Sequence, residues 1–169
     1  MANYGRFQKG DQTFFGEARG EEILELDGNP MDGKVRSSKS HPLGAVKILT
    51  PVAPSKIIAV GLNYADHAKE SGKDIPKEPL IWFKAPTSSL EHGGTIRIPY
   101  PEHRTDYEAE LCVVIGKPTK GVSQAQALSH VFGFTCSQDI SDRTIQNAES
   151  QWARCKSFDT FTPFGPFIR

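Results

Sequence analysis

Residues 106 to 115 read Asp-Tyr-Glu-Ala-Glu-Leu-Cys-Val-Val-Ile, which places two carboxylates just before an apolar run. The run predicts a strand over residues 107 to 115. Because strand side chains alternate with a period of two, Glu108 and Glu110 should project from the same face. Two such carboxylates repel each other without a cation, and their oxygens are ligands that Mg²⁺, Mn²⁺ and Ca²⁺ prefer. The pattern indicates either a metal site or a solvated strand edge.

A third carboxylate, Asp139, follows a second apolar stretch. The sequence predicts a strand over residues 132 to 137, so Asp139 would stand at its end beside Glu108 and Glu110 and complete a metal site. The alternative is that Asp139 is the N-cap of the polar helical segment predicted over residues 141 to 152.

His67 and Glu70 are three residues apart in a segment that predicts a short helix over residues 63 to 70, with Asn63 as N-cap and Gly72 after its end. This spacing lets a carboxylate hold one imidazole tautomer while the other nitrogen accepts a proton, as a general base does. A solvated surface pair is the alternative interpretation.

Basic and amide side chains follow Asp139 in the sequence. Arg143, Gln146 and Lys156 can line the same site and bind a substrate carboxylate or a developing oxyanion. Ordinary surface charges are the alternative.

The rest of the chain predicts an α+β protein that is mainly β. Residues 1–50 have short aromatic and apolar runs separated by glycines, typical of a small β-rich domain, and residues 51–169 form the second domain. Within the second domain we expect a buried strand over residues 56 to 61, extended pieces at 80 to 84 and 95 to 98, and a helix over 123 to 131.

Charge and cysteine content exclude several classes of protein. Lys plus Arg and Asp plus Glu both number 20, so no net charge favours nucleic acid or an anionic membrane. No apolar run approaches the roughly 20 residues of a membrane span, and Met1 to Gly10 lack the apolar stretch of a secretory signal. The 3 cysteines have no C-x-x-C spacing, so we expect buried free thiols in a reducing, cytoplasmic compartment.

Four blocks of the sequence together resemble the fumarylacetoacetate hydrolase family. They are residues 56–70 (Lys-Ile-Ile-Ala-Val-Gly-Leu-Asn-Tyr-Ala-Asp-His-Ala-Lys-Glu), 106–111 (Asp-Tyr-Glu-Ala-Glu-Leu), 138–143 (Gln-Asp-Ile-Ser-Asp-Arg) with Gln146, and 156–160 (Lys-Ser-Phe-Asp-Thr). Their order and spacing agree with the family over residues 51–169, and residues 1–50 resemble it more loosely.

The resemblance implies a role for each candidate residue. Glu108, Glu110 and Asp139 match the metal-binding carboxylates, with Mg²⁺ or Mn²⁺ as the usual cation and Ca²⁺ as a substitute. It also implies a mixed β-roll with a small N-terminal β-rich domain, a homodimer, and a small 2-oxo acid substrate converted through a metal-bound enolate. The remaining matches are the catalytic pair His67 and Glu70, the polarising Lys156, and the substrate-binding Arg143 and Gln146.

Two departures qualify the resemblance. Val60 stands where the branch that cleaves fumarylacetoacetate has an aspartate, which favours the acylpyruvase, oxaloacetate decarboxylase and hydroxymuconate-type isomerase branch. The chain ends at Arg169, where family members continue with further strands, so we expect a β-roll that is incomplete at its C-terminus. The alternative function is therefore a truncated, non-catalytic relative that keeps the metal site or only a partner-binding surface.

Overall fold

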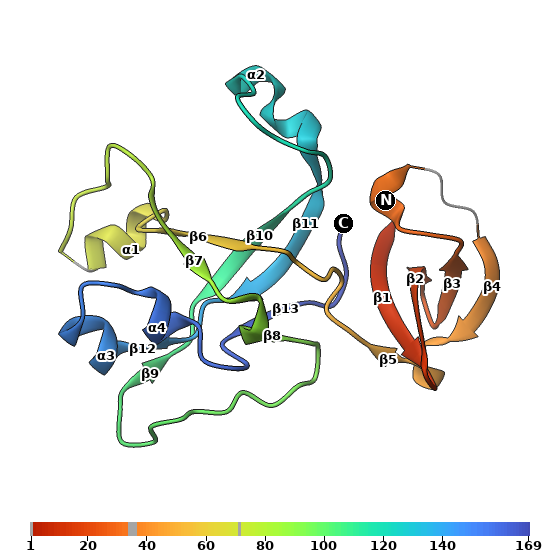
Figure 1. Cartoon of the computed structure of the whole chain (residues 1–169), viewed down its shortest axis with the longest axis horizontal. Helices are drawn as coiled ribbons and strands as arrows, with labels where there is room; N and C mark the ends of the chain where they lie inside the picture. Colours follow the sequence, from red (N-terminus) through yellow and green to blue (C-terminus); the bar gives the residue numbers. More distant parts are fainter. Residues whose placement is uncertain (1, 34–36, 71) are drawn as a thin grey trace.

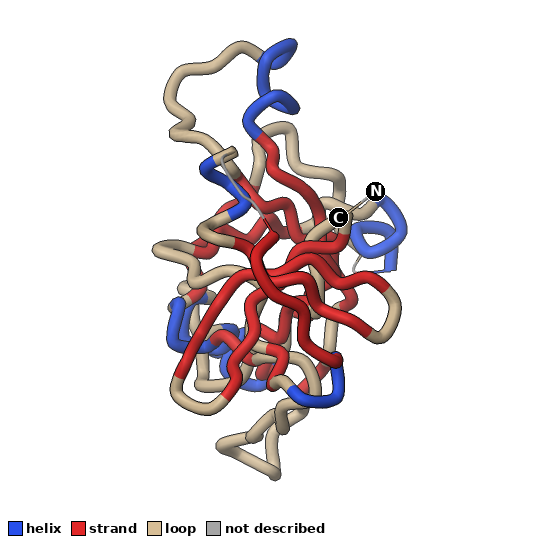
Figure 2. The backbone as a smooth tube through the Cα atoms, turned by 90° about the vertical axis from the view of Figure 1, so that its right-hand side faces the viewer, coloured by secondary structure: helices blue, strands red, loops and turns tan. Residues whose placement is uncertain are grey.

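The computed structural model describes residues 2–33, 37–70 and 72–169, without the side chains of residues 37 and 38. Strands dominate and the helices are short, so the α+β, mainly β prediction is confirmed. Figure 2 shows the strands in the middle of the molecule and the helices at its periphery. Within the described residues, no helix is long and apolar enough to cross a bilayer.

The N-terminal part is a 5-stranded antiparallel sheet in the order β4-β3-β2-β1-β5. Alternating burial in β1 and β2 directs Phe7 and Phe14 into one core with Ile23, as the period of two requires. The strands are β1 (Asn3–Lys9), β2 (Gln12–Arg19), β3 (Glu22–Leu26), β4 (Ser37–Pro42) and β5 (Lys47–Ile48). Two 3-10 turns, η1 (Pro30–Asp32) and η2 (Leu43–Ala45), lie between them.

The second part contains a 4-stranded sheet in the order β10-β11-β13-β8 and two smaller pairs, β6-β7 and β9-β12. Figure 1 shows this part beside the N-terminal sheet, with α2 projecting from one end. Its strands are β6 (Ile57–Gly61), β7 (Leu80–Lys84), β8 (Ser89–Leu90), β9 (Thr105–Asp106), β10 (Ala109–Ile115), β11 (Val131–Gln138), β12 (Ser141–Asp142) and β13 (Thr162–Gly165). Its helices are α1 (Ala65–Glu70), α2 (Gln124–Ala127), α3 (Arg143–Ala148) and α4 (Ala153–Lys156), with 3-10 turns η3 (Pro86–Ser88) and η4 (Leu128–His130).

The last residues of the chain join the two parts. The backbone N–H of Tyr4 donates to the carbonyl of Ile168 at 2.9 Å, and the N–H of Ile168 donates back to Tyr4 at 2.8 Å. Phe167 packs against the N-terminal core, with its ring centroid 6.2 Å from that of Phe7. The N-terminal sheet therefore shares its core with the segment that follows β13.

Several local predictions need correction. The first helix begins at Ala65, so Tyr64 rather than Asn63 accepts its first backbone hydrogen bond, from Ala68. Residues 95 to 98 form no strand, because this segment runs through a loop in which the N–H of Arg97 donates to the Thr160 hydroxyl. The polar segment 141 to 152 divides into β12 and α3 instead of one helix.

The cysteine prediction was wrong for one residue. All three thiols are free, and Cys155 is buried and Cys112 partly buried. Cys136 is exposed because it lies on the outer face of β11, opposite the outward-facing Leu111 of β10.

Candidate active site

The candidate site forms where the ends of several short elements meet. β7 ends at Lys84, β10 begins just after Glu108, and β11 ends just before Asp139. Antiparallel pairing of β10 with β11 sets Ala109 opposite Gln138, so Glu108 and Asp139 lie side by side, and the N–H of Asp139 donates to the carbonyl of Glu108 at 3.0 Å. The α4 helix packs against β7 and β12 and brings Lys156 to the same place.

Lys156 joins the predicted carboxylates. Its ammonium donates to Glu108 Oε2 at 2.9 Å, to Asp139 Oδ2 at 2.8 Å and to the Ser141 hydroxyl at 2.6 Å. The side chain is only 3% exposed, so these hydrogen bonds replace the water that the ammonium loses on burial. The Trp82 ring lies 5.1 Å from the ammonium and covers it on one side.

Lys84 is a site residue that sequence reasoning missed. Its ammonium pairs with Oδ1 of Asp139 and donates to the carbonyl of Phe161 at 3.1 Å. Burial lowers the pKa of Lys84, although the Asp139 charge opposes that shift. A lysine at the inner end of an apolar strand was the available signal, because a buried charge requires a partner.

These contacts exclude one of the two interpretations of Asp139, the helix cap. Both of its carboxylate oxygens bind lysine ammonium groups. The N-cap of α3 is Asp142, whose side chain accepts from the N–H of Ile145 at 2.9 Å. Asp139 is therefore not the helix cap.

Glu108 is held as a carboxylate. Burial opposes its ionisation, but the charges of Lys156 and Arg143 outweigh burial and keep the pKa of Glu108 below its usual value. Its second oxygen accepts from the Arg143 guanidinium. The strand begins two residues later than predicted, so Glu108 lies in the short break between β9 and β10.

Glu110 has the opposite electrostatic environment. Burial, together with the negative charges of Asp139 and Glu108, raises the pKa of its carboxyl. Glu110 forms no ion pair with any described residue. The three carboxylates therefore influence one another, and Glu110 is the one left without a cation.

The site does not have a closed metal geometry. Across residues 2–33, 37–70 and 72–169, no three His, Cys, Asp or Glu side chains have the arrangement of a metal site. The chemistry of the donor set nevertheless fits a hard divalent cation, because three carboxylates supply oxygen ligands and Glu110 has no ion-pair partner among the described residues.

Arg143 and Gln146 are close to the carboxylates but are engaged with the protein. The Arg143 guanidinium donates to Asp106 Oδ2 at 3.0 Å, to Gln146 Oε1 at 2.7 Å and to Glu108. Arg143 therefore orients Glu108, and Gln146 fixes one side of the guanidinium fork.

The α1 helix lies next to β10 through Tyr64. The Tyr64 hydroxyl accepts from the N–H of Leu111 at 3.3 Å, and its hydrogen bond to Glu110 moderates the raised pKa of that carboxyl. His67 is partly buried one turn into α1, whereas Glu70 is exposed. No hydrogen bond joins these two described side chains, so the orienting contact between them stays a prediction.

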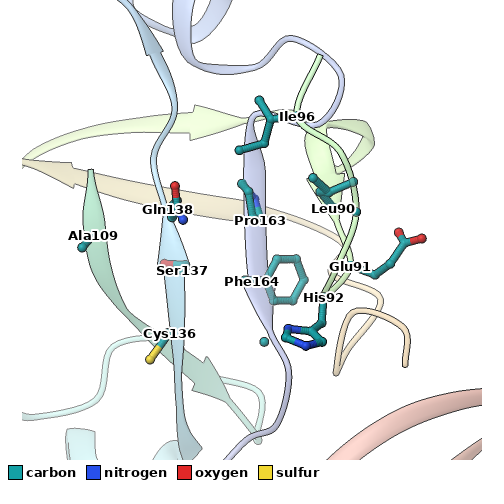
Figure 3. Close-up of a pocket in the computed structure, with 13 residues that line it drawn as sticks. Leu90, Glu91, His92, Ile96, Ala109, Cys136, Ser137, Gln138, Pro163 and Phe164 are labelled. Atoms are coloured by element: carbon teal, nitrogen blue, oxygen red, sulfur yellow. The ribbon is translucent and has the colours of Figure 1, made fainter. Parts of the chain in front are cut away.

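A cavity of about 390 Å³ lies between β11, β13 and the loop that follows β8, and none of the predicted site residues lines it. Ala109 and Cys136 line it, and because side chains alternate along a strand they face away from Glu110. Figure 3 shows Cys136 and Phe164 on neighbouring strands, with His92 beside Phe164. The cavity and the carboxylate cluster thus share no residue.

Two family models match almost the whole chain. Fumarylacetoacetate (FAA) hydrolase C-terminal matches residues 56–169 and Rv2993c-like, N-terminal, matches residues 3–51. The chain belongs to the fumarylacetoacetate hydrolase family. The first match contains all the candidate site residues, and the predicted resemblance is confirmed.

Curated relatives match most of this chain but only part of their own length. An uncharacterised protein of Archaeoglobus fulgidus is 42% identical over 97% of this chain and 62% of its own length. The human mitochondrial protein named oxaloacetate tautomerase FAHD2A is 41% identical over 75% of this chain and 41% of its own length. The chain therefore spans less than two thirds of these curated relatives.

Solved structures agree with the fold. A Mycobacterium marinum protein named 2-hydroxyhepta-2,4-diene-1,7-dioate isomerase aligns with a TM-score of 0.89 and 33% identity, over 100% of this chain and 66% of its own chain. Maleylpyruvate hydrolase from Sphingobium, solved with manganese(II) and pyruvate, aligns with a TM-score of 0.74 at 24% identity over 100% of this chain and 67% of that chain, and so shows the fold alone.

Proposed function

We propose that this chain binds a divalent cation through Glu108, Glu110 and Asp139 and acts on a small 2-oxo acid. The observation that carries the proposal is the buried cluster in which Lys156 joins Glu108 and Asp139 while Glu110 lies beside them without an ion-pair partner. The cluster lies within the matched family segment. Mg²⁺ and Mn²⁺ are the cations we expect, because both prefer carboxylate oxygen.

The chain's own residues have distinct tasks in this proposal. When bound, the cation supplies Lewis-acid stabilisation of the negative charge that develops on the 2-oxo group. Lys156 holds Glu108 and Asp139 in place and adds positive charge beside the substrate oxygen. Arg143 fixes the other oxygen of Glu108, while Lys84 pairs with Oδ1 of Asp139, the oxygen that Lys156 does not bind.

His67 is the proposed proton-transfer group. It lies on α1, which Tyr64 attaches to β10 next to Glu110. In isomerisation, His67 removes a proton from carbon beside the 2-oxo group, and in hydrolytic C–C cleavage it removes one from water. Glu70 would orient the ring when the substrate is bound, since catalytic hydrogen bonds often tighten only in that complex. Decarboxylation needs only the cation and a proton donor, so all three reactions use one site.

A metal titration with matched variants tests this proposal. We expect calorimetry to show Mg²⁺ or Mn²⁺ binding by the wild-type chain and by Glu102→Ala, an exposed control, but not by Glu108→Ala. Turnover is then measured with acylpyruvates, oxaloacetate and hydroxymuconate-type diacids in the presence of the cation. Equal metal binding by Glu108→Ala contradicts the ligand assignment, and a folded, metal-loaded chain inactive on the whole panel contradicts the enzymatic proposal.

We also propose a homodimer in the cytoplasm. β10 is an edge strand, and its outer face exposes Leu111 at 61% and Ile115 at 53% beside Phe134 of β11 at 40%. A contiguous apolar face next to an open strand edge favours association. Three free cysteines support a reducing compartment.

A further inference from the structure

His103 and Asp142 form a contact that the proposed reaction does not use. His103 Nδ1 lies 2.7 Å from Asp142 Oδ2, and the Asp142 side chain is 1% exposed. The Tyr100 ring stacks on the imidazole with centroids 4.9 Å apart. Tyr100 in turn meets Phe158, which meets the fully buried Phe161. The imidazole therefore lies between the Tyr100 ring, which is connected to the core through Phe158 and Phe161, and a buried carboxylate.

Asp142 uses its second oxygen to begin α3. Oδ1 accepts from the N–H of Ile145 at 2.9 Å, which satisfies one of the backbone donors that a helix leaves without a partner in its first turn. His103 thus holds one oxygen of the carboxylate whose other oxygen caps the helix. A change in the rotamer of Asp142 would break one contact or the other.

The residue after this cap is Arg143, and its position depends on the start of α3. Its backbone N–H donates to the carbonyl of Arg104 at 2.8 Å, and β12 pairs with β9 at the same point. Its guanidinium reaches Asp106 and Glu108. A continuous series of contacts therefore leads from His103 through Asp142 and Arg143 to the carboxylate of Glu108.

We propose that His103 is a positioning residue for the carboxylate site. By holding Asp142 in the rotamer that caps α3, it directs the Arg143 guanidinium to Glu108 and so fixes the orientation of that carboxylate. His103 does not touch the substrate. This proposal rests on the proposed function, and it adds a residue that lies outside the carboxylate cluster.

Three substitutions separate positioning from general stabilisation. H103N keeps an N–H donor close to the place of Nδ1, H103Q moves that donor one methylene further, and H103L removes it at similar bulk. Loss of a hydrogen bond to a charged group changes an equilibrium constant by roughly tenfold or more. We therefore expect H103L and H103Q to lower kcat about tenfold. We expect KM to change little and H103N to recover most of kcat. H130L, on the remote η4 turn, is the matched control and should keep the wild-type kcat.

A spectroscopic measurement tests the same series without turnover. The ¹⁵N–¹H signal of the Arg143 side-chain Nε–H, which donates to Asp106, should shift in H103L and H103Q and stay in place in H103N. If H103L does not fold, H103Q against H103N makes the same comparison.

The outcomes separate this inference from the proposed function. An inactive wild type with the expected Arg143 shifts overturns the function and supports the positioning. The positioning role is overturned if H103L keeps the wild-type kcat and its Arg143 signal does not move. H103Q serves for this comparison if H103L does not fold. A kcat that H103N fails to recover also overturns it, because the loss of the ring that stacks on Tyr100, rather than loss of the donor, would then be responsible.

Discussion

The ammonium of Lys156 lies 2.8 Å from Oδ2 of Asp139, and both side chains are almost completely buried. The same ammonium binds Glu108, so one lysine compensates two carboxylates. Removing one partner of a buried ion pair leaves an uncompensated charge, which typically costs several kcal/mol. The stability of the cluster therefore depends strongly on Lys156.

We predict that Lys156→Met lowers the free energy of unfolding by about 3 kcal/mol. The methionine keeps the length of the side chain but leaves the carboxylates to Lys84 and Arg143. Urea unfolding measures the change, and Lys120→Met at an exposed position should alter the free energy by less than about 0.5 kcal/mol. Equal effects of the two substitutions would show that the buried pair is energetically unimportant.

Glu110→Gln should stabilise the protein when no divalent cation is present. The pKa of Glu110 is raised, so the folded chain binds this proton more tightly than the unfolded chain does. Its ionisation therefore weakens folding as the pH rises through that raised pKa, and glutamine removes the penalty. We expect Tm at pH 7 to increase by a few degrees, measured by circular dichroism.

The same variant should lose the stabilisation that a cation gives. With saturating Mn²⁺ the wild-type Tm should rise, because a ligand that binds only the folded state stabilises it, whereas the Tm of Glu110→Gln should not respond. The exposed Glu102→Gln should behave as wild type in both measurements. A Glu110→Gln protein that is less stable than wild type without metal would refute the electrostatic argument.

His67→Ala should keep the cation and lose turnover. A general base contributes on the order of 10²–10⁴ in rate, so kcat should fall by about that factor while calorimetric metal binding is unchanged. His130→Ala removes an imidazole that is hydrogen-bonded to Thr119 on a turn outside the candidate site, and it should retain activity. A fully active His67→Ala enzyme would exclude the general-base role.

Leu111→Lys should weaken the proposed homodimer. Leu111 lies on the outer face of edge strand β10, where a lysine ammonium would be buried without a partner in an interface. Analytical ultracentrifugation should show a smaller association constant. Leu128→Lys changes a leucine that is 77% exposed on the remote η4 turn, and it should leave the association constant unchanged. A fully dimeric Leu111→Lys protein would exclude this face.

Local pattern predicted much of the fold. The period of two and the glycine punctuation located β7 and β10, and the apolar stretch before Asp139 located β11. The sequence could not decide between a metal-site and a capping role for Asp139, because both place an aspartate between a strand and a helix. The structure excludes the capping role, because Asp142 caps α3 and Asp139 pairs with Lys84, which is 55 residues away along the chain.

The side chains that the basic residues contact could likewise not be predicted from the sequence. Arg143 was predicted to bind substrate, but its guanidinium is shared by Asp106, Glu108 and Gln146. These contacts arise from the pairing of the two-residue strands β9 and β12, which have no periodicity to detect. The metal, catalytic and substrate roles of the candidate residues stay predictions until the variants are measured.

The backbone pairing of Tyr4 with Ile168 affects the order of folding during synthesis. The N-terminal sheet is synthesised well before Phe167, which packs on Phe7 but follows it only after the whole second part of the fold. Until then one side of that aromatic core stays open to solvent, and closing the loop carries the entropy cost of a long-range contact. Complete protection of this core from chaperones and proteases must therefore wait until the segment that contains Phe167 and Ile168 has been made.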